Sequence, residues 1–418
     1  MPHLFKKICF LFLLTRPCLL YGKPTLDISG NQKTKSEVIQ REFELAIQNQ
    51  EQDLLQSFEK RLKRMQIFSS IQIQKKNTDD YFLQVEEKWT TIPIVKIATG
   101  GGVVQTTLGV YDPNLFGSFI ESGAQYEQLG SEGSGVFWLK NPRFLNRDQL
   151  LDFQYWNTKR LRLKYDQTDI DPKEKQGFIL KRERFYLGFE PRLGLNTTFR
   201  ISLDQSRDEF NESDLSDDLR RKFRGQKRPP DVDVTQVGLG IDWGALDWNV
   251  HLMEGTKISV LVKYHWVKNQ VADPFYQSEV SFIYASMINQ EINFAQRFLV
   301  GTTDTDLLQY WNYFGGLDRI RGFIDNRFSG RHYFLSNSEL RRTMMEKSSW
   351  ITQGTVFTDL LSAVEKTNDI DRISSGSMGL GVRIIFPKIY RAVLRFDYAK
   401  PLIKSDNQNL SFGLQQFF

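Results

Sequence analysis

Residues 379–386 read Gly-Leu-Gly-Val-Arg-Ile-Ile-Phe, and residues 392–399 read Ala-Val-Leu-Arg-Phe-Asp-Tyr-Ala. In both stretches an apolar side chain occupies every second position, and glycine, arginine and aspartate occur only between them. Successive side chains of a strand point to opposite faces of a sheet, so this period of two predicts strands with one apolar and one polar face. The same period recurs through most of residues 91–418, for example over 151–156. We therefore predict that this region is an all-β domain.

Alternation alone leaves two architectures open. In a soluble sandwich the apolar face forms the core, whereas in a transmembrane barrel it contacts lipid and the polar face lines the lumen. Sixteen segments can be marked in residues 91–418, among them 149–164 and 176–190. This is about 20 residues per strand and connection, which suits membrane-spanning strands of about ten residues. The long connections share one side of the sheet: 165–175, 206–233, 302–329 and 361–375. Short turns such as 112–114 fall on the other side, so we predict a 16-stranded antiparallel transmembrane β-barrel.

The overall composition excludes two classes of protein. A mean hydropathy of −0.42 argues against a bundle of membrane-spanning helices, and after residue 22 no run approaches the ~20 apolar residues that such a helix needs. The 55 basic and 50 acidic residues nearly balance, which gives no support for nucleic-acid binding. Residues 206–233, rich in Asp, Arg and Lys, are best interpreted as a solvated loop.

The first 22 residues are typical of a secretory signal peptide. Lys6 and Lys7 form a short basic start, and the apolar run 8–14 is too short to anchor the chain in a bilayer. Both cysteines of the chain, Cys9 and Cys18, lie in this segment. The mature protein is therefore expected to have no disulfide and no cysteine ligand for a metal.

Residues 23–90 follow a different pattern, which predicts a small α+β module of order β-α-α-β-β. Helical periodicity is clear over residues 36–48, and Asp53 is placed to cap a second helix with an apolar stripe. Two short alternating segments, 71–73 and 81–85, predict half-buried strands joined by a polar turn. A sheet this small has exposed edges, and such an edge can accept an extended peptide as an additional strand. The alternative for this module is a simple spacer.

One motif indicates a family. Residues 315–323 read Gly-Gly-Leu-Asp-Arg-Ile-Arg-Gly-Phe, and the strand count places them after the eleventh strand, in the sixth outer loop. Paired glycines followed by an arginine-glycine-aromatic triplet resemble the sixth-loop signature of the BamA/TamA-type outer-membrane assembly superfamily, also known as the bacterial surface antigen family. The residues of the motif are Gly315, Gly316, Ile320, Arg321, Gly322 and Phe323.

Other stretches extend this resemblance over nearly the whole mature chain. Segments of residues 23–90 look like a POTRA domain, the periplasmic polypeptide-transport module of this family, present here as a single copy. Residues 111–117 resemble the family's early periplasmic turn. The last nine residues resemble the carboxy-terminal signal by which outer-membrane proteins are recognised for insertion, with four residues on one face: Leu410, Phe412, Leu414 and Phe418.

The resemblance also implies a position for Arg321. Its loop, about 28 residues over 302–329, is long enough to fold back into the barrel lumen. A guanidinium withdrawn from water is costly unless it is paired, and its planar fork suits carboxylates. By resemblance the partners are Glu339 on the twelfth strand and Asp359 on the thirteenth.

The function implied is assembly of outer-membrane proteins or translocation of polypeptides, with no cofactor. The barrel would lie in the bacterial outer membrane and the POTRA domain in the periplasm. The partners would be unfolded outer-membrane or secreted clients, membrane lipid and accessory periplasmic subunits. Clients would dock on the POTRA edge and leave through a lateral seam between the first and last barrel strands. Two alternatives stay open: a dedicated two-partner secretion pore, and a passive outer-membrane channel or structural protein.

Motifs of enzymes do not occur in the sequence. We find no Gly-x-Ser-x-Gly elbow, no Gly-x-Gly-x-x-Gly phosphate loop and no His-Glu-x-x-His metal motif. The four histidines are scattered along the chain. We therefore predict no catalytic residues, no metal site and no enzymatic activity.

Overall fold

The structure is a computed structural model of the whole chain. It describes residues 24–48, 53–77, 79–100, 103–129, 132–165, 174–211, 217–249, 251–315, 319–324, 326–369, 375–402 and 409–414. The predicted signal peptide, residues 1–22, lies outside the described residues.

An amino-terminal module comes first. It consists of β1 (Thr25–Ser29), α2 (Ser36–Gln48), α3 (Leu54–Met65), β2 (Phe68–Lys75) and β3 (Asp80–Glu87). The three strands form a sheet of order β1-β3-β2, in which β1 is parallel and β2 antiparallel to β3. As predicted, the Asp53 side chain caps α3 by accepting a hydrogen bond from the Gln56 N–H. Both helices pack on the sheet through a buried core centred on Phe43, Phe58 and Leu83.

The rest of the chain is dominated by one large antiparallel sheet. In the described residues this sheet has sixteen strands. Their order in the sheet is β4 to β14, followed by β17 to β21. The first eight are β4 (Ile92–Gly100), β5 (Val103–Asp112), β6 (Glu121–Leu129), β7 (Glu132–Asn141), β8 (Gln149–Tyr165), β9 (Glu174–Leu193), β10 (Thr197–Asn211) and β11 (Val232–Asn249). The others are β12 (Leu252–Val267), β13 (Phe275–Met287), β14 (Ile292–Thr303), β17 (His332–Glu346), β18 (Ile351–Val364), β19 (Ser375–Ile385), β20 (Val393–Pro401) and β21 (Asn409–Leu414).

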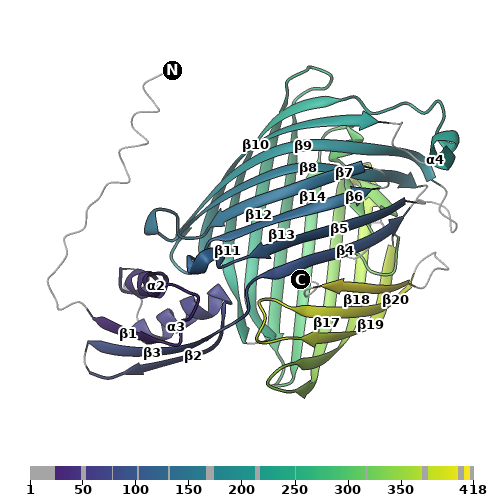
Figure 1. Cartoon of the computed structure of the whole chain (residues 1–418). Coiled ribbons are helices and arrows are strands. Elements are labelled where there is room, and N and C mark those ends of the chain that lie inside the picture. Colours follow the sequence, from purple (N-terminus) through teal and green to yellow (C-terminus); the bar gives the residue numbers. More distant parts are fainter. Residues whose placement is uncertain are drawn as a thin grey trace, which may run out of the picture.

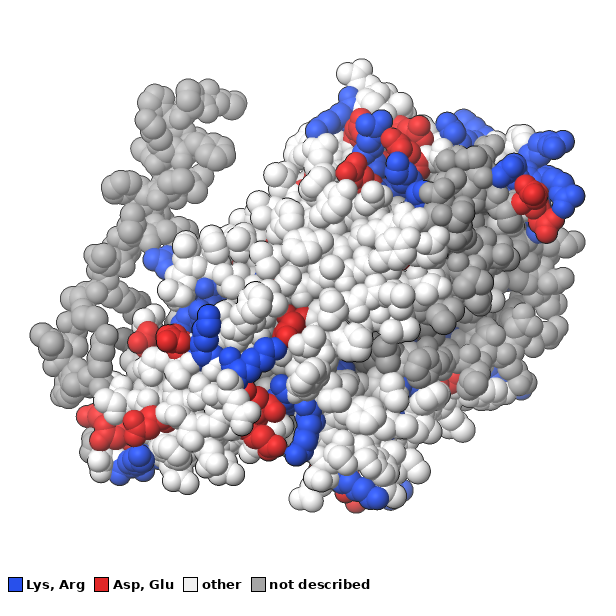
Figure 2. Space-filling view, viewed as in Figure 1, with Lys and Arg blue, Asp and Glu red and all other residues white. Residues whose placement is uncertain are grey.

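The two faces of this sheet settle the choice that alternation left open. On β19, Leu380 and Val382 are 61% and 45% exposed, whereas the neighbouring Arg383 is fully buried. On β20, Phe396 is 40% exposed and Asp397 is fully buried. Apolar side chains therefore face outward and charged side chains inward, which is the distribution of a membrane barrel rather than of a soluble sandwich. In the view of Figure 2 an uncharged band on the sheet separates charged groups at its two ends.

The sheet curls into a barrel-shaped body, with the amino-terminal module beneath one end and the short helix α4 (Asp217–Lys222) at the other (Figure 1). Turns at the module end include the 3-10 segments η1 (Leu115–Gly117) and η2 (Phe144–Asn146). None of the helices that the structure describes is long and apolar enough to cross a membrane.

Longer connections lie at the end of the barrel farthest from the module. The connection after β14, residues 304–331, is called loop six here; it contains η3 (Leu308–Tyr310) and a two-stranded hairpin of β15 (Asn312–Phe314) and β16 (Phe328–Gly330). The connection after β18 contains η4 (Thr367–Asp369). Apolar side chains of these connections pack on the strand ends in buried clusters, one of which joins Phe223, next to α4, to Leu163 and Ile179.

Candidate functional site

Loop six projects its central arginine into the interior of the barrel. Ile320 and Phe323 are buried with Phe314, Phe328 and other apolar groups, and this cluster fixes the loop against the inner wall. Gly322 has a φ of +87°, a conformation that favours glycine, and a Cβ added there would come within 3.0 Å of the Ala399 Cβ on β20. The loop therefore packs closely on the wall only because this residue has no side chain.

Gly315 supplies a second special position at the start of the motif. Its φ is +130°, and an added Cβ would lie 2.0 Å from the Ile324 carbonyl oxygen. The close approach of 315 and 324 draws the two ends of the motif together. Gly316, the other glycine of the predicted pair, lies outside the described residues.

Arg321 has no solvent-exposed side-chain surface and is held by two wall carboxylates. Its Nε and Nη2 donate to Asp359 Oδ2 and Oδ1 at 2.8 and 2.7 Å, a bidentate pair, and its backbone N–H also donates to Asp359. Its Nη1 donates to Glu339 on β17. The guanidinium lies 3.5 Å from the centre of the Phe357 ring, so one face of the cation contacts an aromatic ring.

The carboxylates around Arg321 are shared with three more arginines. Arg341 Nη2 lies 2.7 Å from Glu339 Oε2, and Arg383 Nη1 lies 2.6 Å from Asp397 Oδ1. Arg395 Nε lies 3.3 Å from Asp397 Oδ2, which is also 3.8 Å from Arg321. Because each bridging carboxylate compensates more than one buried arginine, removing any one of them strands several charges. We call this group, with Asp359, the lumenal arginine cluster.

The sequence-based hypotheses account for part of this site. The structure brings Arg321, Glu339 and Asp359 together and packs Ile320, Gly322 and Phe323 around them. Sequence reasoning assigned no role to Arg341, Arg383, Arg395 or Asp397. Charged residues at polar positions of neighbouring strands were the available signal, but only the strand register shows which of them meet.

The predicted carboxy-terminal signal lies at the edge of the sheet. Leu410, Phe412 and Leu414 lie in β21, opposite Tyr398, Phe396 and Leu394 of β20. Phe418 lies outside the described residues.

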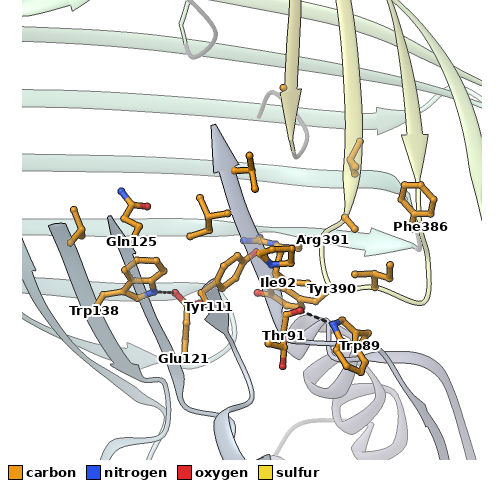
Figure 3. Close-up of a pocket in the computed structure, with 18 of the residues that line it drawn as sticks. Trp89, Thr91, Ile92, Tyr111, Glu121, Gln125, Trp138, Phe386, Tyr390 and Arg391 are labelled. Atoms are coloured by element: carbon orange, nitrogen blue, oxygen red, sulfur yellow. Dashed lines mark hydrogen bonds between the residues drawn. The ribbon is translucent and has the colours of Figure 1, made fainter. Parts of the chain in front are cut away.

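The first and last strands of the sheet form its two edges. In the residues that the structure describes, no ladder joins β4 to β21. Near this seam, at the module end, lies a cavity of about 980 Å³ lined by the start of β4, the 386–392 turn and the inner face of β6 and β7 (Figure 3). Several aromatic side chains line it, among them Trp89, Tyr111, Trp138 and Tyr390.

The segment before β4 is bonded to the turn between β19 and β20, close to the opposite edge of the sheet. The Trp89 N–H donates to the Lys388 carbonyl at 2.8 Å, and the Tyr390 N–H donates to the Trp89 carbonyl at 2.8 Å. This isolated parallel bridge ties the connection between module and barrel to the turn between β19 and β20. Among the described residues, this bridge connects the chain on the two sides of the seam at the module end.

Buried ion pairs fix the amino-terminal module to the barrel. Glu42 of α2 is fully buried and accepts two hydrogen bonds from Arg143, at 2.6 and 2.7 Å. Arg61 of α3 donates to Asp148 at 3.0 Å. Burial alone would raise the pKa of Asp148, but the charges of Arg143, Arg192 and Arg61 outweigh this effect and hold the pKa below its usual range.

A second junction joins the start of α2 to the first turn of the barrel. The Lys33 ammonium donates to Asp112 at 2.6 Å, and the Asn114 amide donates to the Thr34 hydroxyl at 2.8 Å. Glu87 accepts hydrogen bonds from the backbone N–H groups of residues 32–34. Residues 112–114, predicted as a periplasmic turn, thus contact the module directly.

Neither the site nor its surroundings has the ligand set of a metal centre. Among the described residues, no three His, Cys, Asp or Glu side chains lie together in an arrangement that could hold a metal ion. The acidic groups of the lumenal arginine cluster are already paired with guanidinium groups.

The inward charges, the outward apolar face and the loop that returns into the lumen define an outer-membrane type of β-barrel. Residues 117–418 match the model of the Omp85 superfamily domain, and the chain belongs to this superfamily. Omp85 proteins are outer-membrane proteins of insertion and secretion machinery, so the chain is of the outer-membrane protein assembly or secretion type. No protein in the curated collection matches the chain.

Solved structures show the same fold at low sequence identity. BamA from Haemophilus ducreyi lacking POTRA domains 1–3 aligns with a TM-score of 0.53 and 14% identity, over 93% of this chain and 82% of that one. CdiB from Escherichia coli aligns with a TM-score of 0.62 and 12% identity, over 93% of this chain and 74% of that one. CdiB from Acinetobacter baumannii aligns with a TM-score of 0.56 and 14% identity, over 94% of this chain and 73% of that one.

Proposed function

We propose that the protein inserts client polypeptides into, or moves them across, the bacterial outer membrane by means of its lateral seam. Residues 91–418 form a sixteen-stranded barrel, and residues 23–90 form a single POTRA domain on the periplasmic side. The observation that carries the proposal is the pair of edges, β4 and β21, beside a cavity at the module end. The signal peptide directs export and is absent from the mature protein.

The physical basis is the hydrogen bonding of the two edge strands. In hydrocarbon an unpaired backbone group costs several kcal/mol, so a client strand that pairs with an open edge is strongly favoured over lipid. β21 and β4 are the two strands of the described sheet that pair with a neighbour on one side only, which supports opening between them. The process needs only backbone hydrogen bonding and no cofactor.

The POTRA domain delivers clients in an extended form. β2 is an edge strand of its sheet, and an extended peptide adds to such an edge through main-chain hydrogen bonds. The buried Glu42–Arg143 pair fixes this domain beneath the barrel. Accessory periplasmic subunits, where they exist, would bind the surfaces of the domain that the barrel leaves free.

Loop six argues against the passive channel. Its described residues pack on the inner wall of the barrel in a buried cluster, so they occupy part of the path that free diffusion would need. The fold shared with CdiB keeps a dedicated secretion pore as the second candidate.

Depletion of the protein in its own organism separates these functions. Insertion predicts a broad loss of outer-membrane proteins measured by quantitative mass spectrometry of membranes. A dedicated secretion pore predicts loss of one secreted protein with an unchanged membrane proteome. An unchanged membrane proteome and secretome would refute both functions.

A further inference from the structure

The lumenal arginine cluster extends from loop six to the strand at the seam. Asp397 of β20 contacts Arg383 and Arg395 and reaches within 3.8 Å of Arg321. All four side chains are buried, Arg395 being 5% exposed. Asp397 is therefore the carboxylate at which loop six meets the last two strands.

The register of the strands explains why a carboxylate is needed at this place. Arg383 of β19 and Arg395 of β20 lie directly opposite each other on the inner face. Like charges in directly opposed positions repel, and burial strengthens the repulsion. Asp397 lies between them, with Oδ1 toward Arg383 and Oδ2 toward Arg395.

Two glycines provide the space for these side chains. A Cβ added to Gly381 of β19 would lie 2.2 Å from Asp397 Oδ1, so the carboxylate occupies the volume that a side chain would fill. A Cβ added to Gly413 of β21 would lie 2.8 Å from Arg395 Nη2 and 3.1 Å from its Nε. The Arg395 guanidinium thus lies across the backbone of the last strand.

We propose that Asp397 is a positioning residue that couples loop six to the seam by holding Arg395 across Gly413, and that this contact sets how firmly β21 pairs with β20. The inference rests on the proposed function, because it makes loop six a control on the strand that opens. When Arg321 is seated, Asp397 and its arginines are fixed, and β21 is held in register. Withdrawal of Arg321 loosens the cluster and frees the last strand for exchange with a client strand.

Hydrogen–deuterium exchange of the purified, refolded barrel tests the coupling without any client. Asp397→Asn, which keeps the shape and removes the charge, should speed exchange of the β21 amides about tenfold while β11 stays protected. Asp242→Asn is the matched control, since Asp242 pairs with Lys257 at 3.0 Å elsewhere in the lumen and should leave β21 unchanged. Equal β21 exchange in wild type and Asp397→Asn would overturn the proposal.

A double-mutant cycle separates positioning from general destabilisation. Gly413→Ala displaces the Arg395 guanidinium and Arg395→Ala removes it, so each should speed β21 exchange. The double variant should exchange no faster than Arg395→Ala, because the added methyl then meets an empty space. Gly135→Ala, whose Cβ has only an ordinary 3.5 Å contact, is the control for adding a methyl to a barrel strand. Fully additive effects would contradict the Arg395–Gly413 contact.

Arg321→Ala completes the test of loop six. It should speed β21 exchange in the wild-type background and add nothing in the Asp397→Asn background. Additive effects of the two changes would overturn the coupling. None of these variants replaces an apolar side chain of β21. The exchange experiment uses no client polypeptide. If the depletion experiment refutes the proposed function, the exchange rates still test the coupling. If the exchange rates refute the coupling, the depletion experiment still tests the proposed function.

Discussion

Substitution of Arg321 by alanine is the most informative single change in the site. It removes the cation that pairs with Asp359 through two hydrogen bonds and with Glu339 through a third. It also removes the guanidinium from the face of Phe357. The wall carboxylates stay buried when the arginine is absent.

The energetic cost of Arg321→Ala depends on the hydrogen-bond and ion-pair partners that each carboxylate retains. Glu339 keeps Arg341 and Arg383 within 3.4 Å, whereas Asp359 keeps a hydrogen bond from the Asn337 amide at 2.8 Å and the attraction of the Arg297 charge. Breaking a buried ion pair by removing one partner costs about 3–5 kcal/mol, and here most of that cost falls on Asp359. A cost of this size raises the open population of loop six by roughly 10²–10⁴-fold.

Limited proteolysis of the folded barrel measures that population, provided that opening and closing are fast relative to cleavage. Chymotrypsin is suitable because the substitution leaves its sites unchanged. Arg319→Ala is the control: this neighbouring arginine is 35% exposed in its side chain, and its ion pair with Glu279 spans 3.8 Å. Its loss should cost no more than about 1 kcal/mol.

The same assay gives the refuting result. Arg321→Lys should fall between wild type and alanine, because a point charge does not reproduce the planar fork. Arg321→Ala/Asp359→Ala should regain part of the lost protection, since the stranded charge is gone. Cleavage of Arg321→Ala at the wild-type rate would show that these ion pairs do not hold the loop.

Three further outcomes follow from other parts of the structure. Because the pKa of Asp148 lies below its ordinary value of 3.8, its pairing with Arg143 stabilises the module–barrel junction fully above that value and is lost as the pH falls below it; protection factors of the α2 and α3 amides, in which the intrinsic pH dependence of exchange is divided out, should be flat from pH 7 to 5 and fall below about pH 4, and unchanged protection at pH 3 would contradict this. Gly322→Ala should expose loop six to protease, because φ is +87° and the Cβ meets Ala399; full protection would refute the tight approach. Leu380→Arg should lower the unfolding free energy in bilayers by about 2–4 kcal/mol, with Leu380→Phe close to wild type, and equal stability of the two would contradict the lipid-facing assignment.

Much of the sheet could be predicted from the period of two. The predicted segment 149–164 corresponds to β8, Gln149–Tyr165, because alternation is clean where one face meets lipid. At the outer ends the pattern fails: the prediction of a strand over 176–190 stops short of both ends of β9, Glu174–Leu193. Phe178, Ile179 and Leu180 are consecutive and all buried, since outer connections cover the face that would otherwise be polar.

The contacts between distant segments could not be predicted from spacing. Glu42 and Arg143 meet across 101 residues, and nothing in the local pattern of either marks it as buried. The same is true of Asp397, which resembles any polar residue of an alternating strand until the register places it between two arginines. Arg321 was identified because the glycine pair and the arginine-glycine-phenylalanine triplet around it resemble a family signature, and its partners Glu339 and Asp359 also came from that resemblance.

The seam tests the central claim most directly. The chain has no cysteine after residue 18, so one cysteine in the first half of β4 and one in β21 can form a single disulfide across the seam. Positions 241 and 260 are paired in β11 and β12, so a control disulfide between them links two strands that are not expected to separate. In a depletion strain, the reduced seam variant and the oxidised control should both restore outer-membrane proteins, whereas the oxidised seam variant should not. Full restoration by the oxidised, locked seam would contradict the account.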